Sequence, residues 1–269
     1  MIIDIHTHTF PDEIAETAIS KLSLSSGIKP FVKGTINSLI ESMKTNNIDY
    51  SVIMPIVTKP TQHNTINQTA IFINENYSSE GIISFGSIHP DNDDYKDIIR
   101  FLVRNNIKGI KLHPVFQGVY FDDIRYMRII DFASEQGLTI MVHGGYDISF
   151  PDVDLVTTEH ILPVVKELKP PKMIMAHMGA WKDWDNMAEL LAQHSVMIDT
   201  SFTMTPHKFL SDEKFKKLIK LAGSNNVLMG SDSPWSMQGD SIEVIKNIGL
   251  AKEETSLILG ENARLLLNL

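Results

Sequence analysis

Short apolar runs alternate with longer amphipathic segments along the whole chain. Eight of these runs are rich in β-branched residues, as buried strands are, and polar or glycine-containing stretches bound them. The runs cover Ile2–His6, Ser51–Pro55, Ile82–His89, Lys108–His113, Leu138–His143, Lys172–His177, Ser195–Thr200 and Val227–Asp232. We therefore expect eight strands.

The segments between these runs have apolar residues three and four positions apart, which predicts helices packed on a sheet. The clearest are Thr35–Asn46, Thr65–Tyr77, Tyr95–Asn105, Asp122–Glu135 and Asp212–Ala222. Strands that alternate with helices favour a parallel sheet, and the strand ends recur about every 32 residues, the size of a βαβ unit. Eight such units predict an α/β fold, a (β/α)8 TIM barrel. An open doubly wound sheet is the alternative, although it usually has fewer strands.

The composition narrows the function classes. The 269 residues are 43% hydrophobic and show no linker or low-complexity tract, so we expect a single domain over 1–269. The net charge of −9 disfavours nucleic acid as a partner. No apolar run approaches the roughly 20 residues of a membrane span, and no signal peptide is evident at the start, which predicts a cytoplasmic protein. The absence of cysteine means that any metal must bind nitrogen and oxygen atoms.

Reactive side chains stand at the ends of the predicted strands. Five of the eight runs end in histidine and the last ends in aspartate; these residues are His6, His89, His113, His143, His177 and Asp232. A barrel collects its functional groups at the C-terminal ends of its strands, so residues far apart in sequence become neighbours there.

Alternation along the first strand predicts which side chains point inward. Asp4, His6 and His8 share one face, and we expect that face to line the barrel interior. Ile3 and Ile5 are then expected to face the helices.

Several of these residues have a metal-binding and a structural interpretation. His6 and His8, two apart on a strand, can hold one ion through nitrogen, as zinc and its neighbours prefer, or can be satisfied by backbone carbonyls. His143 and His177 each close an apolar run before a glycine, and each is a metal-site candidate or a hydrogen-bonded core histidine. Asp232 is a metal ligand or a helix N-cap.

An ordered set of motifs resembles the amidohydrolase superfamily. The motifs are Asp-Ile-His-Thr-His followed by Phe-Pro, Ser-Ile-His-Pro, Gly-Ile-Lys-Leu-His-Pro, Val-His-Gly, Ala-His-Met-Gly and Gly-Ser-Asp-Ser-Pro. They are most similar to its amidohydrolase-2 branch, which includes relatives of aminocarboxymuconate-semialdehyde decarboxylase. The C-terminal Ile-Leu-Gly-Glu-Asn-Ala-Arg-Leu-Leu resembles the closing helix of that branch. The resemblance extends over essentially residues 1 to 269.

The resemblance implies a catalytic metal centre. His6, His8, His143 and Asp232 would bind one divalent ion, expected to be zinc, with manganese or iron as alternatives and a second ion left open. His177 would hydrogen-bond a metal-bound water and, with Asp232, serve as a catalytic residue that moves its proton. A divalent metal lowers the pKa of its bound water to about 7, so that hydroxide is available at neutral pH to attack a carbonyl. We therefore expect an enzyme, a metal-dependent hydrolase of an amide, lactone or ester bond in a small molecule.

Three further residues are candidates for substrate binding. Lys111 is either the carboxylated lysine that bridges two metals in binuclear members of the superfamily or, the interpretation we prefer because it lies deeper in the strand, a structural or substrate-orienting lysine. His113 is expected to contact substrate or to support a metal ligand. Trp235 closely follows Asp232, as Trp181 follows His177, and either tryptophan can line the pocket or pack in the core.

Other functions compete with hydrolysis. Histidinol-phosphatase-type phosphoesterases would need an early Asp-His pair that the chain lacks, and TatD-type nucleases would need a glutamate where it has lysine. Decarboxylation of an unsaturated or aromatic acid uses the same site; we rank it second because Arg125, Arg128 and Arg264 are not at strand ends. A non-catalytic barrel that retains metal for stability ranks third. The expected partner is a small-molecule substrate, and by analogy with relatives a homodimer.

Overall fold

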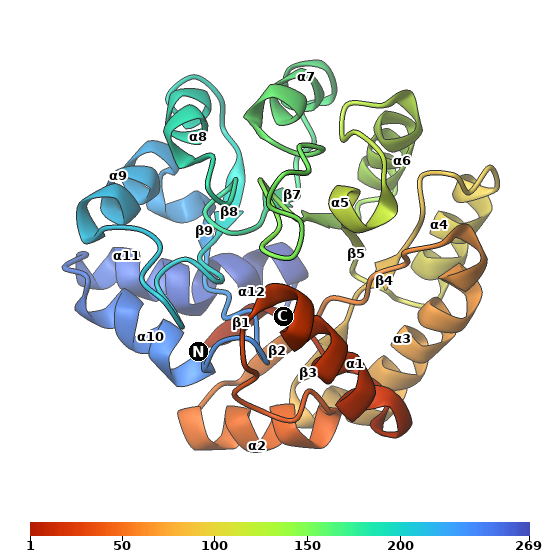
Figure 1. The fold of residues 1–269 in the computed structure, drawn as a ribbon, viewed down its shortest axis with the longest axis horizontal. Helices are drawn as coiled ribbons and strands as arrows, with labels where there is room; N and C mark the ends of the chain where they lie inside the picture. The colour runs from red at the N-terminus through yellow and green to blue at the C-terminus, as the bar shows by residue number, and fades with distance from the viewer.

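Strands and helices alternate around a ring in the computed structural model, which describes all 269 residues (Figure 1). The strands are β1 Ile3–Thr7, β2 Tyr50–Ile53, β3 Ile82–Ser84, β4 Gly86–Ser87, β5 Gly109–Leu112, β6 Thr139–Val142, β7 Met173–Met175, β8 Met197–Asp199 and β9 Val227–Leu228. The helices are α1 Asp12–Ser26, α2 Ile36–Asn46, α3 His63–Tyr77, α4 Tyr95–Arg104, α5 Pro114–Gln117, α6 Ile124–Glu135, α7 Thr158–Leu168, α8 Trp184–Leu191, α9 Asp212–Ala222, α10 Gln238–Asn247, α11 Lys252–Ser256 and α12 Asn262–Leu267. Short 3₁₀ turns cover Pro60–Gln62, Ser78–Glu80 and Ser224–Asn226, and a π-helical turn covers Leu257–Glu261.

All strands pair in parallel, in the order β1-β2-β3 and then β4-β5-β6-β7-β8-β9. Backbone hydrogen bonds connect the segment after β9 to β1: Ile5 N donates to Met229 O at 2.9 Å and Asp232 N donates to His6 O at 2.9 Å. Because β3 and β4 follow one another directly, these bonds complete a ring. The predicted (β/α)8 barrel is confirmed.

The third predicted strand is divided. Ile82–His89 contains two strands, β3 and β4, separated at Phe85. Here two backbone N–H groups bond to side-chain amides of α3 and not to a neighbouring strand. Asn74 Oδ1 accepts from Ser84 N at 2.6 Å, and Asn67 Oδ1 accepts from Ser87 N at 2.9 Å. Alternation of apolar residues does not reveal such helix-to-strand bonds.

The prediction for the first strand was wrong in one respect. β1 has a bulge between Asp4 and Thr7, which shifts its register against β2. Ile3 and Ile5 belong to a buried cluster with apolar side chains of β2, β6, β7 and β9, which places them inside the barrel. Asp4 instead points outward, where its carboxylate accepts from Gln238 Nε2 of α10 at 2.8 Å. The bulge then brings His6 back to the interior.

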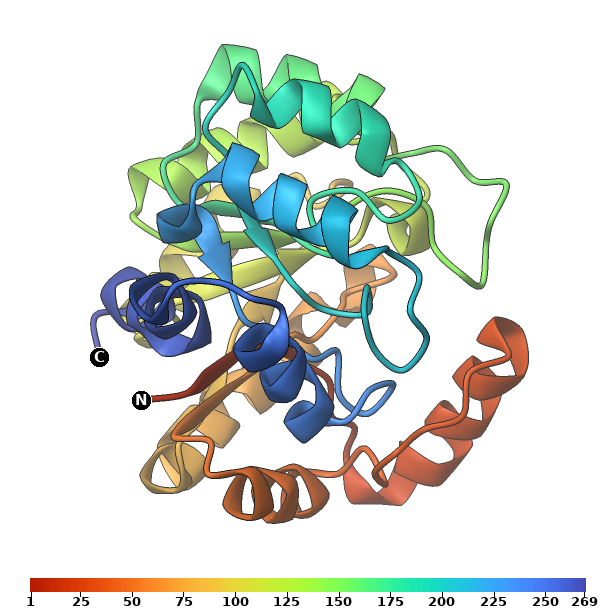
Figure 2. The same ribbon diagram turned by 90° about the vertical axis from the view of Figure 1, so that its left-hand side faces the viewer.

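The five predicted helices correspond to α2, α3, α4, α6 and α9; the bounds of α9 match, and each of the others differs by one or two residues at one end. At the base of the barrel, Lys108 Nζ donates to Leu267 O of α12 at 2.6 Å, so the final helix covers the amino-terminal ends of the strands. In contrast, α1 projects away from the body of the molecule (Figure 2). None of the helices combines the length and hydropathy that crossing a bilayer requires.

Candidate metal centre and its cavity

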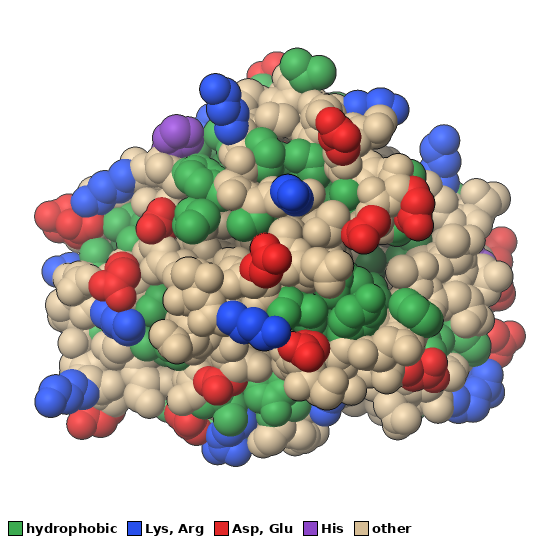
Figure 3. Space-filling model, turned by 90° about the horizontal axis from the view of Figure 1, so that it is seen from below, with side chains coloured by type: hydrophobic (Ala, Val, Ile, Leu, Met, Phe, Trp, Pro, Cys, Tyr) green, Lys and Arg blue, Asp and Glu red, His purple; other side chains and the backbone are tan.

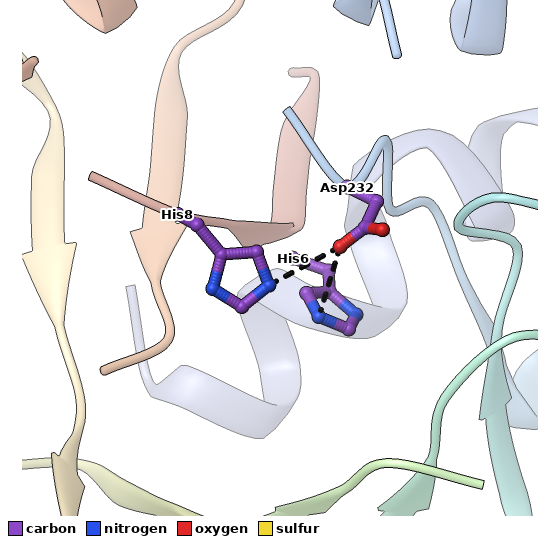
Figure 4. A group of neighbouring side chains, drawn as sticks. All are labelled: His6, His8 and Asp232. Atoms are coloured by element: carbon purple, nitrogen blue, oxygen red, sulfur yellow. Dashed lines mark ion pairs between the residues drawn. The ribbon is translucent and has the colours of Figure 1, made fainter. Parts of the chain in front are cut away.

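Three side chains from the two ends of the chain meet at the mouth of the barrel (Figure 4). Asp232 Oδ1 lies 3.2 Å from His8 Nε2 and 3.5 Å from His6 Nε2. His6 is in β1, His8 follows it, and Asp232 lies in the segment that hydrogen-bonds to β1. The ligand atoms of all three lie within 4.8 Å of one another, as the ligands of a single metal ion do.

The hydrogen bonds of the two imidazoles show that this group fits a cation. His8 Nδ1 donates to the carbonyl of Met54 at 2.9 Å, and His6 Nδ1 donates to Asp199 Oδ2 at 2.7 Å. In the neutral imidazoles both Nε2 atoms therefore carry lone pairs, and both face a carboxylate oxygen. The lone pairs and the carboxylate oxygen repel one another unless a positive charge lies between them. In metal sites, a hydrogen bond donated by the other ring nitrogen, as Nδ1 does here, orients the metal-bound histidine.

The surroundings keep His6 neutral. Burial and the nearby Lys111 charge lower the pKa of His6 from 6.5 to about 4, against the opposing effect of Asp199. Burial would raise the pKa of Asp232, but the neighbouring His8 and His6 outweigh it and the pKa falls. A neutral nitrogen pair beside an ionised carboxylate is a donor set for zinc, manganese or iron.

Lys111 lies at the same centre. Its Nζ is 3.2 Å from His6 Nε2, although the side chain is buried in β5. Burial lowers the pKa of Lys111 from 10.5 to about 8, and the charges of Asp199 and Asp232 oppose this shift. The structure thus places the predicted lysine at the metal centre, with a charge that is compatible with anion binding.

Asp199 was missed in the sequence. It ends β8, and besides His6 Nδ1 it accepts from the backbone N–H of His177 at 2.9 Å and from Ser201 Oγ at 2.5 Å. Burial would raise the pKa of Asp199, but the hydrogen bonds that it accepts from His6 Nδ1 and Ser201 Oγ outweigh burial and hold the pKa well below its usual range. A charged residue closing the apolar run Val-Met-Ile-Asp-Thr was the available signal.

His177 and His143 lie beside the three-residue group. His177 Nε2 is 3.1 Å from His143 Nδ1, and the ring centroid of His177 is 5.3 Å from that of His6. His177 has a φ of 61° and Asp232 a φ of 67°, a left-handed conformation that non-glycine residues adopt mainly where the surrounding bonds enforce it. Gly144, which follows His143, allows close backbone approach, because a Cβ there would lie 2.2 Å from Gly179 O.

A second cluster borders the first. His113, His143 and the buried Asp147 form another group whose ligand atoms lie within 4.8 Å of one another. His113 Nε2 is 3.6 Å and His143 Nε2 is 3.8 Å from Asp147 Oδ2, and the two imidazole rings stack at 4.0 Å. His143 thus belongs to this second cluster and contacts His177, and its nitrogens do not join the group of His6, His8 and Asp232 in this conformation. Asp147 was not a candidate in the sequence.

Both clusters open into one cavity of about 950 Å³. Its walls include Lys111, His113 and Trp235, the predicted substrate contacts, and also Trp181. Lys111 is the only lysine in the wall, and no arginine lines it. Arg125, for example, instead donates to Asp91 and Asp123 on the surface.

His89 stays outside the site. It is buried, but it does not line the cavity, and its Nδ1 accepts from the backbone N–H of Asp91 at 3.1 Å. Of the five histidines and one aspartate at the predicted strand ends, His89 is therefore the one that does not line the cavity.

The fold and the convergent histidines define a (β/α)8 barrel with residue groups suited to a divalent metal at its C-terminal mouth. The chain belongs to the amidohydrolase family, whose model matches residues 3–269. The search of curated proteins found no match.

Several solved structures resemble the fold. An uncharacterised TIM-barrel protein from Bordetella bronchiseptica is 15% identical, with a TM-score of 0.80 over 99% of this chain and 98% of the other. 5-Carboxyvanillate decarboxylase from Novosphingobium aromaticivorans, complexed with manganese and a nitrobenzoic acid, is 16% identical, with a TM-score of 0.73 over 100% of this chain and 96% of the other. 2,6-Dihydroxybenzoate decarboxylase from Rhizobium is 12% identical, with a TM-score of 0.71 over 99% and 98%.

Proposed function

We propose that this chain is a metal-dependent carboxy-lyase, a decarboxylase of an aromatic or unsaturated carboxylic acid, with residues 1–269 as one catalytic unit. The observation that carries the proposal is the position of Lys111, the only lysine or arginine in the cavity wall, at 3.2 Å from His6 Nε2. A cationic side chain beside a cation site is a place for an anion. The similarity to decarboxylases that hold manganese supports the same class.

His6, His8 and Asp232 would hold the ion, and His143 is the proposed fourth ligand. When bound, the ion supplies a positive charge that attracts the substrate acid and stabilises negative charge beside it. The donor set is compatible with zinc, manganese and iron, and the solved relatives favour manganese.

The protein groups have distinct tasks in this reaction. The ammonium group of Lys111 binds and orients the substrate anion. The C–C bond to the carboxylate breaks, carbon dioxide leaves, and the bonding electrons stay on the ring or alkene carbon. His177, which lines the cavity beside His6, is the proposed donor of the proton that this carbon takes up.

Hydrolysis of an amide, lactone or ester is the second candidate. The sequence favours it because no arginine stands at a strand end, and no arginine lines the cavity. The absence of arginine does not disfavour an acid substrate, because Lys111 supplies the positive charge that such a substrate requires.

A direct assay separates the two reactions. Manganese-loaded protein is incubated with a panel of hydroxybenzoic and unsaturated acids, and separately with amides, lactones and esters of similar size. The proposal expects release of carbon dioxide from at least one acid and no hydrolysis. Hydrolysis without any carbon dioxide release would overturn it in favour of the second candidate.

A further inference from the structure

The cavity continues far beyond the metal centre, into a groove between α1 and α3. One wall is a face of α1 with Ile14, Ala18 and Leu22, four residues apart, and the other is a face of α3 with Ile66, Ile73 and Tyr77. Both walls line the same cavity as His6 and Asp232. The groove is thus continuous with the place where the reaction would occur.

The groove is apolar and remains uncovered. Helix α1 has fifteen residues, of which only Ala15 and Ile19 are buried, and Ile14 is 53% exposed. Phe72 on the other wall is 55% exposed. Seen from below, the surface has hydrophobic side chains around a hollow, on the side where α1 and α2 lie (Figure 3). Exposed apolar surface of this kind marks a site that binds an apolar partner.

The volume of the cavity exceeds what a one-ring acid needs. A cavity of about 150 Å³ holds benzene, whereas this cavity measures about 950 Å³. A single-ring acid at the metal centre would leave most of the space, and nearly all of the groove, unfilled. Pockets at the upper end of the usual range of roughly 300 to 1,000 Å³ hold ligands of drug size.

The charges of the wall disfavour an anionic extension. Lys111 is the only lysine or arginine that lines the cavity, and it lies at the metal end. Around the groove the polar residues are uncharged, for example Thr65 and Thr69, and Asp12 and Glu13 at its rim are acidic. A phosphate-bearing or acidic tail would therefore be repelled or left unpaired.

We infer that the substrate is an acid with a long uncharged apolar substituent, with its carboxylate at the metal centre and the substituent between α1 and α3. This inference rests on the proposed function and deepens it, because it assigns the part of the substrate that does not react. Remote binding of this kind holds the reacting bond in place, and the apolar burial supplies the binding energy.

Binding of unreactive probes to the manganese-loaded protein tests the inference. We expect benzoate to bind weakly and 4-alkylbenzoates from methyl to pentyl to bind about fourfold more tightly for each methylene, the gain expected from burying a methylene. Equal dissociation constants throughout the series would overturn the inference. If benzoate binds and the length has no effect, the proposed function stands and only the groove assignment fails; if no carboxylate binds, the proposed function fails.

Two pairs of variants locate the substituent. Ala18→Trp on α1 and Thr69→Trp on α3 fill the groove and should remove the gain for the pentyl probe, with benzoate binding unchanged. Ser20→Trp and Gln68→Trp add the same side chain at exposed positions of the same helices outside the cavity, and should behave like wild type. Sedimentation of all four reveals the competing occupant: a dimer that only the groove variants dissociate, without length-dependent binding, would assign the groove to a second copy and overturn the inference.

Discussion

Asp199 Oδ2 lies 2.7 Å from His6 Nδ1, so a buried carboxylate of β8 orients an imidazole of β1. The same carboxylate accepts from the backbone N–H of His177, whose side chain lies on the other side of the centre. Asp199 therefore positions two residues, one proposed to bind the ion and the other to donate a proton.

Asp199→Asn is expected to weaken manganese binding by about 10- to 100-fold, as the loss of a carboxylate behind a metal-bound histidine usually does. The side chain keeps its shape but loses the charge that holds His6 in the proton-on-Nδ1 form. Calorimetric titration with manganese chloride measures the change. Asp97→Asn, at an exposed carboxylate of α4, is the control. Equal affinity in wild type and Asp199→Asn would refute the positioning role.

His177→Asn should separate metal binding from turnover. The proposed proton donor is not among the proposed ligands, so the metal content should stay the same while kcat falls by about 10²- to 10⁴-fold. Elemental analysis and the carbon dioxide assay measure the two quantities. Loss of the ion in this variant would make His177 a ligand, and unchanged kcat would remove it from the mechanism.

Lys111→Met should have opposite effects on two ligands. Because Nζ lies 3.2 Å from His6 Nε2, the ammonium group competes with a cation for the same lone pair. Its removal is expected to tighten manganese binding or leave it unchanged, and to weaken benzoate binding about tenfold. Both constants come from titrations. Weaker manganese binding with unchanged benzoate binding would show that Lys111 serves the metal and not the acid.

The start of α6 offers a test of stability against pH. Asp123 caps the helix, accepting from Arg125 N at 2.9 Å, and hydrogen bonds from the Arg125 side chain lower the pKa of Asp123 from 3.8 to about 2. Because the folded-state pKa is depressed, the stabilisation is present above pH 4 and is lost as the pH falls through about 2.

Asp123→Ala is therefore expected to lower the free energy of unfolding by about 1 kcal/mol at pH 7, the usual value of an N-cap. Urea unfolding at pH 7 and at pH 2.5 measures the difference from wild type, which should shrink at the lower pH. Asp131→Ala, at an exposed carboxylate later in the same helix, should change neither value. A deficit that is the same at both pH values would contradict the assigned ionisation.

Much of the fold could be predicted from the sequence because an apolar run followed by a segment with helical spacing recurs about every 32 residues, the size of a βαβ unit. The strand ends followed from the same pattern, and so did the convergence of His6, His8 and Asp232, since a barrel brings strand ends together. The orientation of Asp4 could not be predicted, because a bulge changes the alternation without any change in composition.

The parts of the site that escaped prediction depend on long-range contacts. Asp199 is one residue short of the predicted strand end, and only the barrel reveals that it faces His6, 193 positions earlier. Asp147 lies in the loop after β6, where periodicity carries no information. The groove of α1 was also invisible, because an apolar helix face looks the same in sequence whether another helix covers it or a ligand does.

The central claim is that a single cation joins residues from both ends of the chain. Crystals of the manganese-loaded protein, measured at the manganese absorption edge, test it most directly. The account predicts one anomalous peak about 2.0 to 2.3 Å from His6 Nε2, His8 Nε2 and an Asp232 oxygen, close to the bond lengths of divalent ions with such ligands. No peak between these three side chains, or a peak only at His113, His143 and Asp147, would contradict it.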